Sequence, residues 1–388
     1  MGNRLDEIEV SPKLNQRVDE VLHMIERKHR RLVMKRWLIG IGSAAVVFIA
    51  VFMFGVSNPA LAARLPLIGH IFERVEGNVS DKGAYSQNAT KLIEEESKTE
   101  PGQEQVQEQN PYVQTSNGIT FSFSEITATE RALYLAVSVK NEEAFSDYIM
   151  RKNVEWDLDY IWLYLKAEGT IDDMEYVPST VDYMQGQFLD DHTFIGIIRV
   201  DIAHLTYQPT DAEMQEDSTN AGQKVIVPDG YTYHLEISAF GWRADGKREF
   251  LEGDWSFDFK VENGREGVQT VEVNETNEQG EGIASVIKNP YEIYVNPIIP
   301  DGMEVYEYMA IVCDAEGDLL DWQGEYADTF QTWGRNTDMV YVYLCDSTEY
   351  LDELSLYYWS KDYTEKKKTK TFAQYLSEHA LFGTEVTF

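Results

Sequence analysis

The longest uncharged stretch of the chain runs from Trp37 to Val56 and reads WLIGIGSAAVVFIAVFMFGV. Twenty residues of α-helix span about 30 Å, which is the thickness of the hydrocarbon core of a bilayer. Six of the ten residues before it, in RKHRRLVMKR (27–36), are Lys or Arg, and such a basic flank normally stays in the cytoplasm. We expect a single-pass protein of the cell membrane, with residues 37–56 in the bilayer, the N-terminus cytoplasmic and the C-terminal bulk extracytoplasmic.

The next segment, SNPALAARLPLIGHIF (57–72), leaves two interpretations open. Its Ala-Leu-Ala at 60–62 fits a signal-peptidase site, but a signal peptide normally has about 15–30 residues and an apolar region of about 7–15. Both lengths are exceeded here, so we favour an uncleaved anchor. Pro59 and Pro66 interrupt the membrane helix, and we expect a short collar beyond it. Its apolar face is expected to rest on the outer membrane surface and consists of Ile68, Ile71, Phe72 and Val75.

An amphipathic helix is predicted ahead of the anchor, over residues 11–26. Ser11 is suited to the N-cap position and Pro12 to the first helical position. Apolar residues then follow helical spacing on one face, namely Leu14, Val18, Val21, Leu22 and Ile25. This face either lies on the inner leaflet, or merely continues the membrane helix, or binds a protein partner. Because acidic residues flank it as well as basic ones, we favour a protein partner.

The extracytoplasmic part is predicted to be mainly β. Residues 57–112 comprise the collar and an acidic, flexible linker, because 93–111 contain almost no hydrophobic residue. Alternating apolar residues then indicate six or seven antiparallel strands over 113–263, with clear examples in GITFSF and DWSFDFKV. That number of strands favours an immunoglobulin-like β-sandwich. Residues 264–388 are interpreted as a second β-rich domain, with a strand near 353–360 and a C-terminal helix.

Charge and motifs restrict the chemistry. The net charge is −34, and residues 1–36 carry nine Lys/Arg against six Asp/Glu, so the acidity lies beyond the anchor. Nucleic acid is therefore not expected as a partner. No nucleophile elbow, phosphate-binding loop or metal-spaced Cys/His set is present, and we expect neither an enzyme nor a cofactor or metal. The two cysteines, Cys313 and Cys345, each end a predicted strand and are a candidate disulfide in an oxidising compartment.

The collar SNPALAARLPLIGHIF, followed by GITFSFSEI, resembles a family of single-pass membrane proteins of Gram-positive bacteria. The family is known as domain of unknown function, family 4179. The resemblance extends over nearly the whole chain, since the order of tail, anchor, collar, immunoglobulin-like domain and second β domain is the same. It implies no catalytic residues. Members are often described as negative regulators of extracytoplasmic-function (ECF) sigma factors.

These observations lead to two hypotheses. In the first, the protein is a transmembrane anti-sigma factor: Leu14, Val18 and Val21, with Leu22 and Ile25, bind a sigma factor, and the outer domains act as sensors of an unknown extracytoplasmic ligand. In the second, the protein is a membrane-anchored envelope protein. Its β-sandwich domains then bind cell-wall polymer or another exported protein, and the cytoplasmic tail has no partner besides the lipid bilayer.

Overall fold

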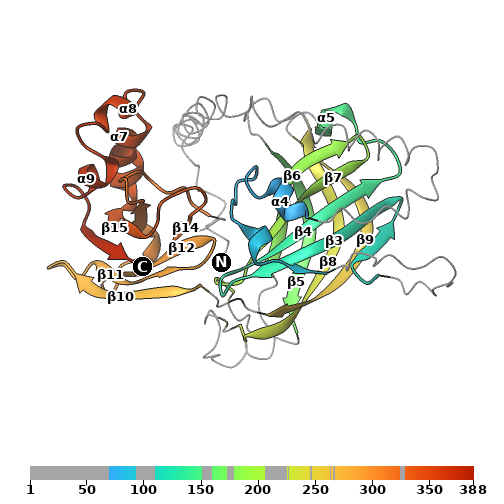
Figure 1. The fold of residues 1–388 in the computed structure, drawn as a ribbon, viewed down its shortest axis with the longest axis horizontal. Coiled ribbons are helices and arrows are strands. Elements are labelled where there is room, and N and C mark those ends of the chain that lie inside the picture. The colour runs from blue at the N-terminus through green and yellow to red at the C-terminus, as the bar shows by residue number, and fades with distance from the viewer. Residues whose placement is uncertain are drawn as a thin grey trace, which may run out of the picture.

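The computed structural model describes residues 70–92, 110–150, 160–172, 179–205, 225, 227–244, 247–262, 264, 267–323 and 328–388. The predicted helix 11–26, the segment 37–56 and most of the acidic linker lie outside these residues. In the portion that is described, no helix has the length and hydrophobicity needed to cross a membrane. The described chain is mainly β, as the alternating pattern predicts, and its two β domains lie side by side (Figure 1).

The first domain is one antiparallel sheet in the order β1-β3-β4-β7-β6-β5-β8-β9, with β2 paired to β3. The strands are β1 (Thr90–Lys91), β2 (Val113–Ser116), β3 (Ile119–Ala128), β4 (Ala132–Asn141), β5 (Ile161–Ile171), β6 (Ser179–Asp190), β7 (Thr193–Asp201), β8 (Gly230–Ala244) and β9 (Lys247–Glu262). The short helix α5 (Asp147–Met150) lies between β4 and β5. GITFSF and DWSFDFKV fall on β3 and β9, so these strand predictions are confirmed.

The sheet curls until its two ends touch. Side chains of β2 and the β2–β3 turn bond to the backbone of β9: Gln114 accepts from the Ser256 N–H at 2.9 Å, and Asn117 donates to the Glu252 carbonyl at 3.0 Å. Inside the curl, Phe121 packs on Trp255 with ring centroids 4.8 Å apart. The predicted two-sheet sandwich is therefore wrong, because alternation indicates which face of a strand is buried but not which strands pair.

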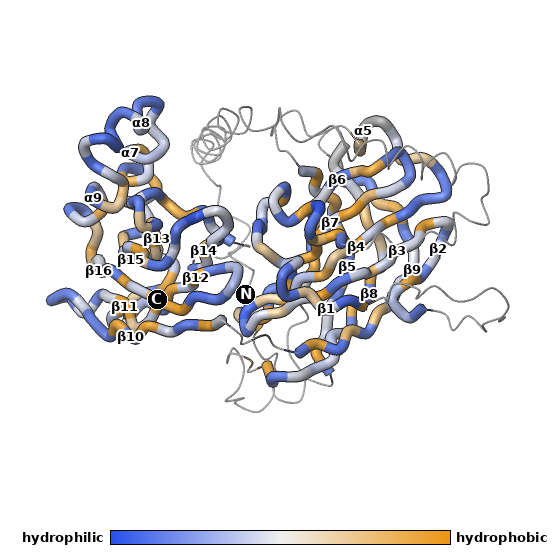
Figure 2. The backbone as a smooth tube through the Cα atoms, in the orientation of Figure 1, coloured by the Kyte–Doolittle hydropathy of each residue, from blue (hydrophilic) through white to orange (hydrophobic). Residues whose placement is uncertain are grey.

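The collar covers the outer face of this sheet. It contains helix α4 (Ile71–Val75), the turn η1 (Tyr85–Gln87) and strand β1. Ile71, Phe72 and Val75 are buried in a hydrophobic cluster with residues of β4 and β7. The prediction that this apolar face rests on the membrane is wrong, since protein covers it. Both faces of β4 are consequently buried from Ala132 to Val139, and Figure 2 shows hydrophobic positions gathered along these strands.

The C-terminal domain contains two smaller sheets. One has four strands, in the order β10 (Gln269–Thr276), β11 (Gly282–Lys288), β12 (Glu292–Ile298) and β14 (Thr329–Gln331). The other has three, in the order β13 (Tyr308–Cys313), β15 (Met339–Asp346) and β16 (Phe382–Thr387). A hydrophobic core that includes Ile293, Phe330 and Val342 draws on both sheets.

Short helices between β15 and β16 cover the other face of the three-stranded sheet. They are α6 (Ser347–Glu349), the π-helix η3 (Tyr350–Leu354), α7 (Ser355–Trp359), α8 (Tyr363–Lys366) and α9 (Phe372–Leu376). The short 3-10 turn η2 (Val305–Glu307) precedes β13. The strand predicted near 353–360 is wrong, although the run LYYW is typical of strands. The Asp346 side chain accepts a hydrogen bond from the Glu349 N–H and starts a helix there. Tyr350 and Leu354 then point into the core.

The two cysteines are free and buried. They lie on paired strands, but Cys313 is opposite Tyr341 while Cys345 is opposite Met309. Four ladder positions at about 3.4 Å each separate them by about 14 Å along the strands. A disulfide needs Cα atoms within about 7 Å. The candidate bridge is therefore not formed, and the register of β13 and β15 is the reason.

Candidate functional site: the junction of the collar and the two β domains

Three tyrosines mark the point where the collar, the first domain and the C-terminal domain meet. Tyr85 comes from the collar, Tyr134 from β4 and Tyr291 from the residue before β12. The Tyr85 ring lies 4.3 Å from the Tyr134 ring and 4.8 Å from the Tyr291 ring, centroid to centroid. All three side chains are fully buried. We call the groups around them the junction.

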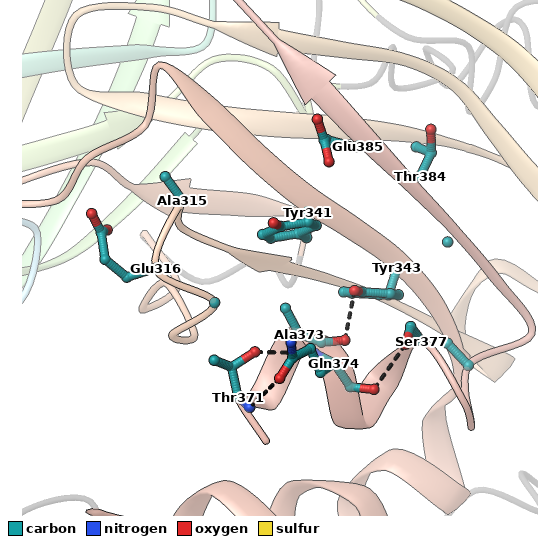
Figure 3. A pocket seen from close by; sticks show the side chains of 13 residues that line it. Ala315, Glu316, Tyr341, Tyr343, Thr371, Ala373, Gln374, Ser377, Thr384 and Glu385 are labelled. Atoms are coloured by element: carbon teal, nitrogen blue, oxygen red, sulfur yellow. Dashed lines mark hydrogen bonds between the residues drawn. The ribbon is translucent and has the colours of Figure 1, made fainter. Parts of the chain in front are cut away.

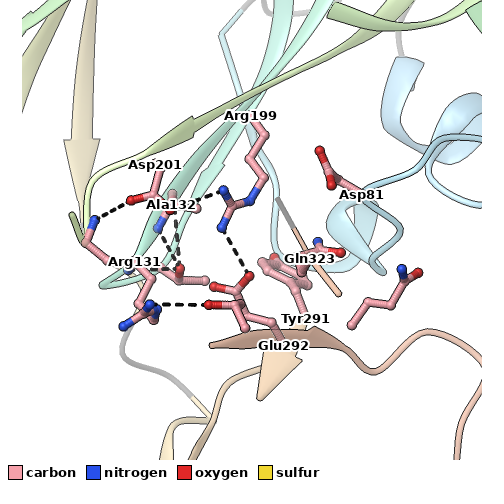
Figure 4. Close-up of polar contacts among 12 residues, drawn as sticks. Asp81, Arg131, Ala132, Arg199, Asp201, Tyr291, Glu292 and Gln323 are labelled. Carbon is pink, nitrogen blue, oxygen red and sulfur yellow. Dashed lines mark hydrogen bonds and ion pairs between the residues drawn. The ribbon is translucent and has the colours of Figure 1, made fainter. Parts of the chain in front are cut away.

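A buried ion pair joins the two domains in the junction. Arg199 of β7 and Glu292 of β12 point toward each other (Figure 4), with 3.5 Å between Nη2 and Oε2. The Tyr134 hydroxyl donates to the same carboxylate at 3.2 Å, and Asp201 holds the guanidinium from the other side at 3.3 Å. Burial raises the pKa of Glu292, while the charge of Arg199 opposes that rise. The buried Glu292 carboxylate therefore depends on Arg199 of the other domain for its counter-charge.

A second set of charges lies beside this pair and also crosses between the domains. Arg131, in the β3–β4 turn, bonds to Asp328 at 2.9 Å and to the Thr329 hydroxyl at 3.2 Å. His204 contacts two carboxylates, with Nδ1 2.9 Å from Asp201 and Nε2 3.3 Å from Asp328. Only an imidazolium can donate from both nitrogens at once.

The pKa shifts agree with this geometry. Burial lowers the pKa of His204, but the hydrogen bonds to Asp201 and Asp328 outweigh burial and raise it above its ordinary value. Burial raises the pKa values of the Asp201 and Asp328 carboxyl groups. Their hydrogen bonds to His204 outweigh this effect and hold both pKa values below the usual range. The arrangement therefore favours charged groups on both sides of the contact.

Glutamine side chains tie the collar to both domains. Gln185 of β6 accepts from the Ser80 N–H at 2.6 Å and donates to the Asp81 carboxylate at 2.8 Å. From the C-terminal domain, Gln323 donates to the Tyr85 hydroxyl at 2.9 Å. Buried amides with bonds on two segments fix the relative position of those segments. The collar is thus held from two sides by side chains far away in sequence.

The junction contains no arrangement typical of catalysis. His204 and Asp201 form a hydrogen-bonded pair, and the second ring nitrogen of His204 faces the Asp328 carboxylate. Over the described ranges, no group of three or more His, Cys, Asp or Glu side chains is placed to hold a metal ion. What the junction can do is couple the positions of three segments.

A separate groove lies in the C-terminal domain between β15, β16 and α9 (Figure 3). Its volume is about 520 Å³, and the ring of Tyr341 lines it. Several polar groups in its wall already have partners within the domain. Tyr343 donates to the Ala373 carbonyl at 2.6 Å, and Thr371 and Gln374 form a capping box at the start of α9.

A comparison with protein families finds a match that includes the collar. Residues 34–141 match the family model described as domain of unknown function (DUF4179). Over these residues the chain is similar to DUF4179. The resemblance inferred from the collar is thereby confirmed, although the match covers residues 34–141 and not nearly the whole chain. No curated protein matches the chain significantly.

One solved structure is a distant match. It is described as the crystal structure of the conserved domain protein from Bacillus anthracis, with a TM-score of 0.41 and 14% sequence identity. The alignment covers 72% of this chain and 85% of that chain. A likeness of this size carries no information on shared activity.

The DUF4179 match ends at Asn141, which is the last residue of β4. It includes the described collar and strands β1 to β4, whereas β7, the partner of β4, and the C-terminal domain lie beyond it. Arg131 and Tyr134 therefore belong to the matched DUF4179 segment, while Arg199, Glu292 and Asp328 do not. The junction is therefore one of the places where the matched segment meets the rest of the described protein, besides the β4–β7 pairing.

The sequence-predicted contact residues Leu14, Val18, Val21, Leu22 and Ile25 lie outside the described residues. Sequence reasoning also missed the junction itself. One signal for it is present in the sequence: Arg199 interrupts the apolar run TFIGIIRVDI, and Glu292 lies between tyrosines in NPYEIYVNP. A charge inside a buried strand needs a partner, but the partner's identity is not encoded locally.

Proposed function

We propose that this protein is a transmembrane anti-sigma factor whose collar links the arrangement of the outer domains to the cytoplasmic helix. The observation that carries the proposal is the double attachment of the collar. Gln185 of the first domain and Gln323 of the C-terminal domain hold the same short segment. Any rearrangement of one domain against the other must therefore break contacts of the collar.

The collar is also close in sequence to the predicted anchor. Only 13 residues separate Val56, the last residue of that anchor, from His70, where the described collar begins. A ligand that binds one arrangement of the two domains better than another shifts the population of that arrangement. In the proposal, this shift changes the position of the anchor and, through it, the accessibility of helix 11–26.

The cytoplasmic contact is proposed to be a helix in a groove. Five apolar side chains on one face of helix 11–26, each contributing about 1.5–3 kcal/mol before ordering costs, are sufficient for a specific complex. Basic and acidic residues, among them Arg17, Asp19 and Glu20, occupy the rest of this predicted helix. Bound in this way, the sigma factor is kept from RNA polymerase.

The test is a transcriptional one. Val18→Asp with Val21→Asp places two charges in the proposed contact, and transcription from the promoter upstream of the gene is then measured. The matched control is Asp19→Asn with Glu20→Gln, which changes the opposite face of the same helix. We expect the apolar-face variant to raise transcription and the control to leave it unchanged. Unchanged transcription in the apolar-face variant, at normal protein level, would contradict the proposal.

A second candidate function is favoured by the groove beside Tyr341. The partly buried Tyr341 ring lines this groove next to polar side chains and is suited to stacking against a sugar, so a membrane-anchored envelope protein that binds wall polymer is the alternative. Binding of soluble wall-polymer fragments to the wild type and to Tyr341→Ala tests it. A tenfold weaker binding by the variant supports the envelope role, and no binding by the wild type argues against it.

A further inference from the structure

A group of exposed hydrophobic side chains lies at one end of the C-terminal domain, away from the junction. Tyr306 is 77% exposed and Val305 67%, which are the highest values among the large hydrophobic residues that the structure describes as exposed. Met303 precedes them, and Leu351 and Leu356 are about half exposed on the helix that follows β15. Exposed apolar residues are ordinary when scattered, but a group of them marks a contact surface.

The two segments that carry these residues are adjacent. The Ser347 hydroxyl donates to the Tyr306 carbonyl at 2.9 Å, which joins α6 to η2. The strand that follows η2 begins at Tyr308, and Tyr308 is opposite Asp346, the last residue of β15. The loop with Tyr306 and the helix with Leu351 therefore leave the same end of the three-stranded sheet.

The helix is distorted in a way that enlarges this surface. The Ser355 N–H donates to the Tyr350 carbonyl, five residues back, so the chain makes a π turn here. Such a turn contains one residue more than an α turn and occurs often at functional sites. It places residues five apart on one side: Tyr350 and Ser355 are both buried, and Leu351 and Leu356, each one residue later, are both exposed. A regular α-helix does not align these two leucines.

The two segments that carry these residues are acidic, and the first basic residues after them lie at 361–370, where Lys366 Nζ is 5.5 Å from the Tyr357 ring. Residues 300–313 and 344–360 contain no Lys or Arg. They contain seven carboxylates, namely Asp301, Glu304, Glu307, Asp346, Glu349, Asp352 and Glu353. A partner that places basic residues against this rim gains electrostatic attraction, whereas an anionic lipid surface is repelled.

We propose that this surface docks a cationic, amphipathic polypeptide segment from another molecule. Its apolar side chains contact Tyr306, Val305 and the paired leucines, and its Lys or Arg side chains lie against the carboxylates. The proposal concerns binding alone, and it stands whether or not helix 11–26 holds a sigma factor.

The test uses the full chain in nanodiscs of zwitterionic lipid and two labelled synthetic peptides with the same leucine pattern. One peptide carries lysines at its polar positions and the other carries glutamates. We expect only the lysine peptide to bind, with an affinity that falls as salt is raised. Equal binding of both peptides, or no binding of the lysine peptide, overturns the proposal.

Variants then assign the binding to this surface. Val305→Ser with Leu351→Ser removes exposed apolar area and is expected to weaken binding at least tenfold. The control is Trp162→Ser, which changes a residue 41% exposed in the first domain. Asp301→Lys with Glu353→Lys is expected to weaken binding of the lysine peptide and to strengthen that of the glutamate peptide.

Two other occupants are distinguished in the same preparation. Sedimentation of the chain alone detects self-association through this face, which the Val305→Ser/Leu351→Ser variant would abolish. Vesicles with anionic lipid detect membrane binding through it. Either result, without binding of the lysine peptide, assigns the surface to that occupant and overturns the proposal.

Discussion

Arg199 and Glu292 form an ion pair at 3.5 Å across the boundary between the two β domains, and both side chains are at most 6% exposed. The pair joins positions 93 residues apart in a chain whose domains otherwise have separate cores. A buried charge without its partner is costly. The relative placement of the domains is therefore specified by charge as well as by the packing of Tyr85, Tyr134 and Tyr291.

Arg199→Met is predicted to destabilise the protein by about 3–5 kcal/mol, because it leaves Glu292 buried without its counter-charge. The control is Arg248→Met on β9, where the side chain is exposed and a change within about 0.5 kcal/mol is expected. Denaturation midpoints of the full chain in detergent measure both. Equal shifts in the two variants would show that the ion pair contributes nothing specific.

His204 is predicted to make the junction sensitive to pH. Its pKa is raised in the folded state, so its stabilising contribution is full below the unfolded value of about 6.5 and is lost as pH rises through the folded pKa. For Asp201 and Asp328 the pKa is lowered. Their contribution to stability is complete above the unfolded pKa of about 3.9 and is lost as the pH falls through the lowered folded pKa values. Together, His204, Asp201 and Asp328 are therefore expected to contribute most to the stability of the junction between about pH 4 and 6.5.

The measurement compares the melting temperature of the wild type at pH 6 and pH 8 with that of His204→Gln. The wild type is expected to lose stability over this interval and the variant to lose less of it. Asp328→Asn, which removes one carboxylate from His204, is expected to reduce the same difference. If the variant and the wild type respond identically, another titrating group governs the pH dependence.

Phe72→Ala is predicted to loosen the collar. The side chain is fully buried and packs on Tyr85 with centroids 5.5 Å apart, and truncating a buried phenylalanine costs about 3–5 kcal/mol. Cleavage within residues 70–92 under limited proteolysis is expected to become faster, as followed by mass spectrometry. Glu73→Ala, an exposed position on the same helix, provides the control and is expected to leave the cleavage rate unchanged.

Cys313 and Cys345 are predicted to be free thiols even without added reductant. Burial raises the pKa of the Cys345 thiol to about 12 and that of Cys313 above its ordinary range, so neither forms the reactive thiolate in the folded protein. A thiol reagent is expected to label no cysteine in the folded chain and both after denaturation. Absence of labelling in denaturant would indicate a disulfide and a different register of β13 and β15.

Much of the local structure could be predicted from the sequence. The alternation of Trp255, Phe257 and Phe259 with polar residues indicates a half-buried strand, and these three side chains are buried in β9. Prediction failed where the environment overrode the pattern. The aromatic run 357–359 reads as a strand, yet the Asp346 cap and the contacts of Tyr350 and Leu354 make it helical.

The junction could not be predicted from such local patterns. Hydrophobic periodicity and secondary-structure propensity describe residues that are close along the chain, whereas His204 and Asp328 are in contact although 124 residues separate them in sequence. Collar residues Ile71 and Phe72 show the same limit: the sequence identifies an apolar face, but it does not say whether lipid or protein covers that face. In the structure, β4 and β7 cover it.

By itself the sequence determined the β-rich class, the positions of most strands and the similarity of residues 34–141 to DUF4179, because these depend on short-range patterns and a contiguous motif. Only the tertiary structure decided that the first sheet curls into one continuous layer, that the collar lies between two domains and that Arg199 pairs with Glu292. Those relationships depend on which distant strands and charges come together. A buried charge requires a partner, but the local sequence does not specify which residue that partner is.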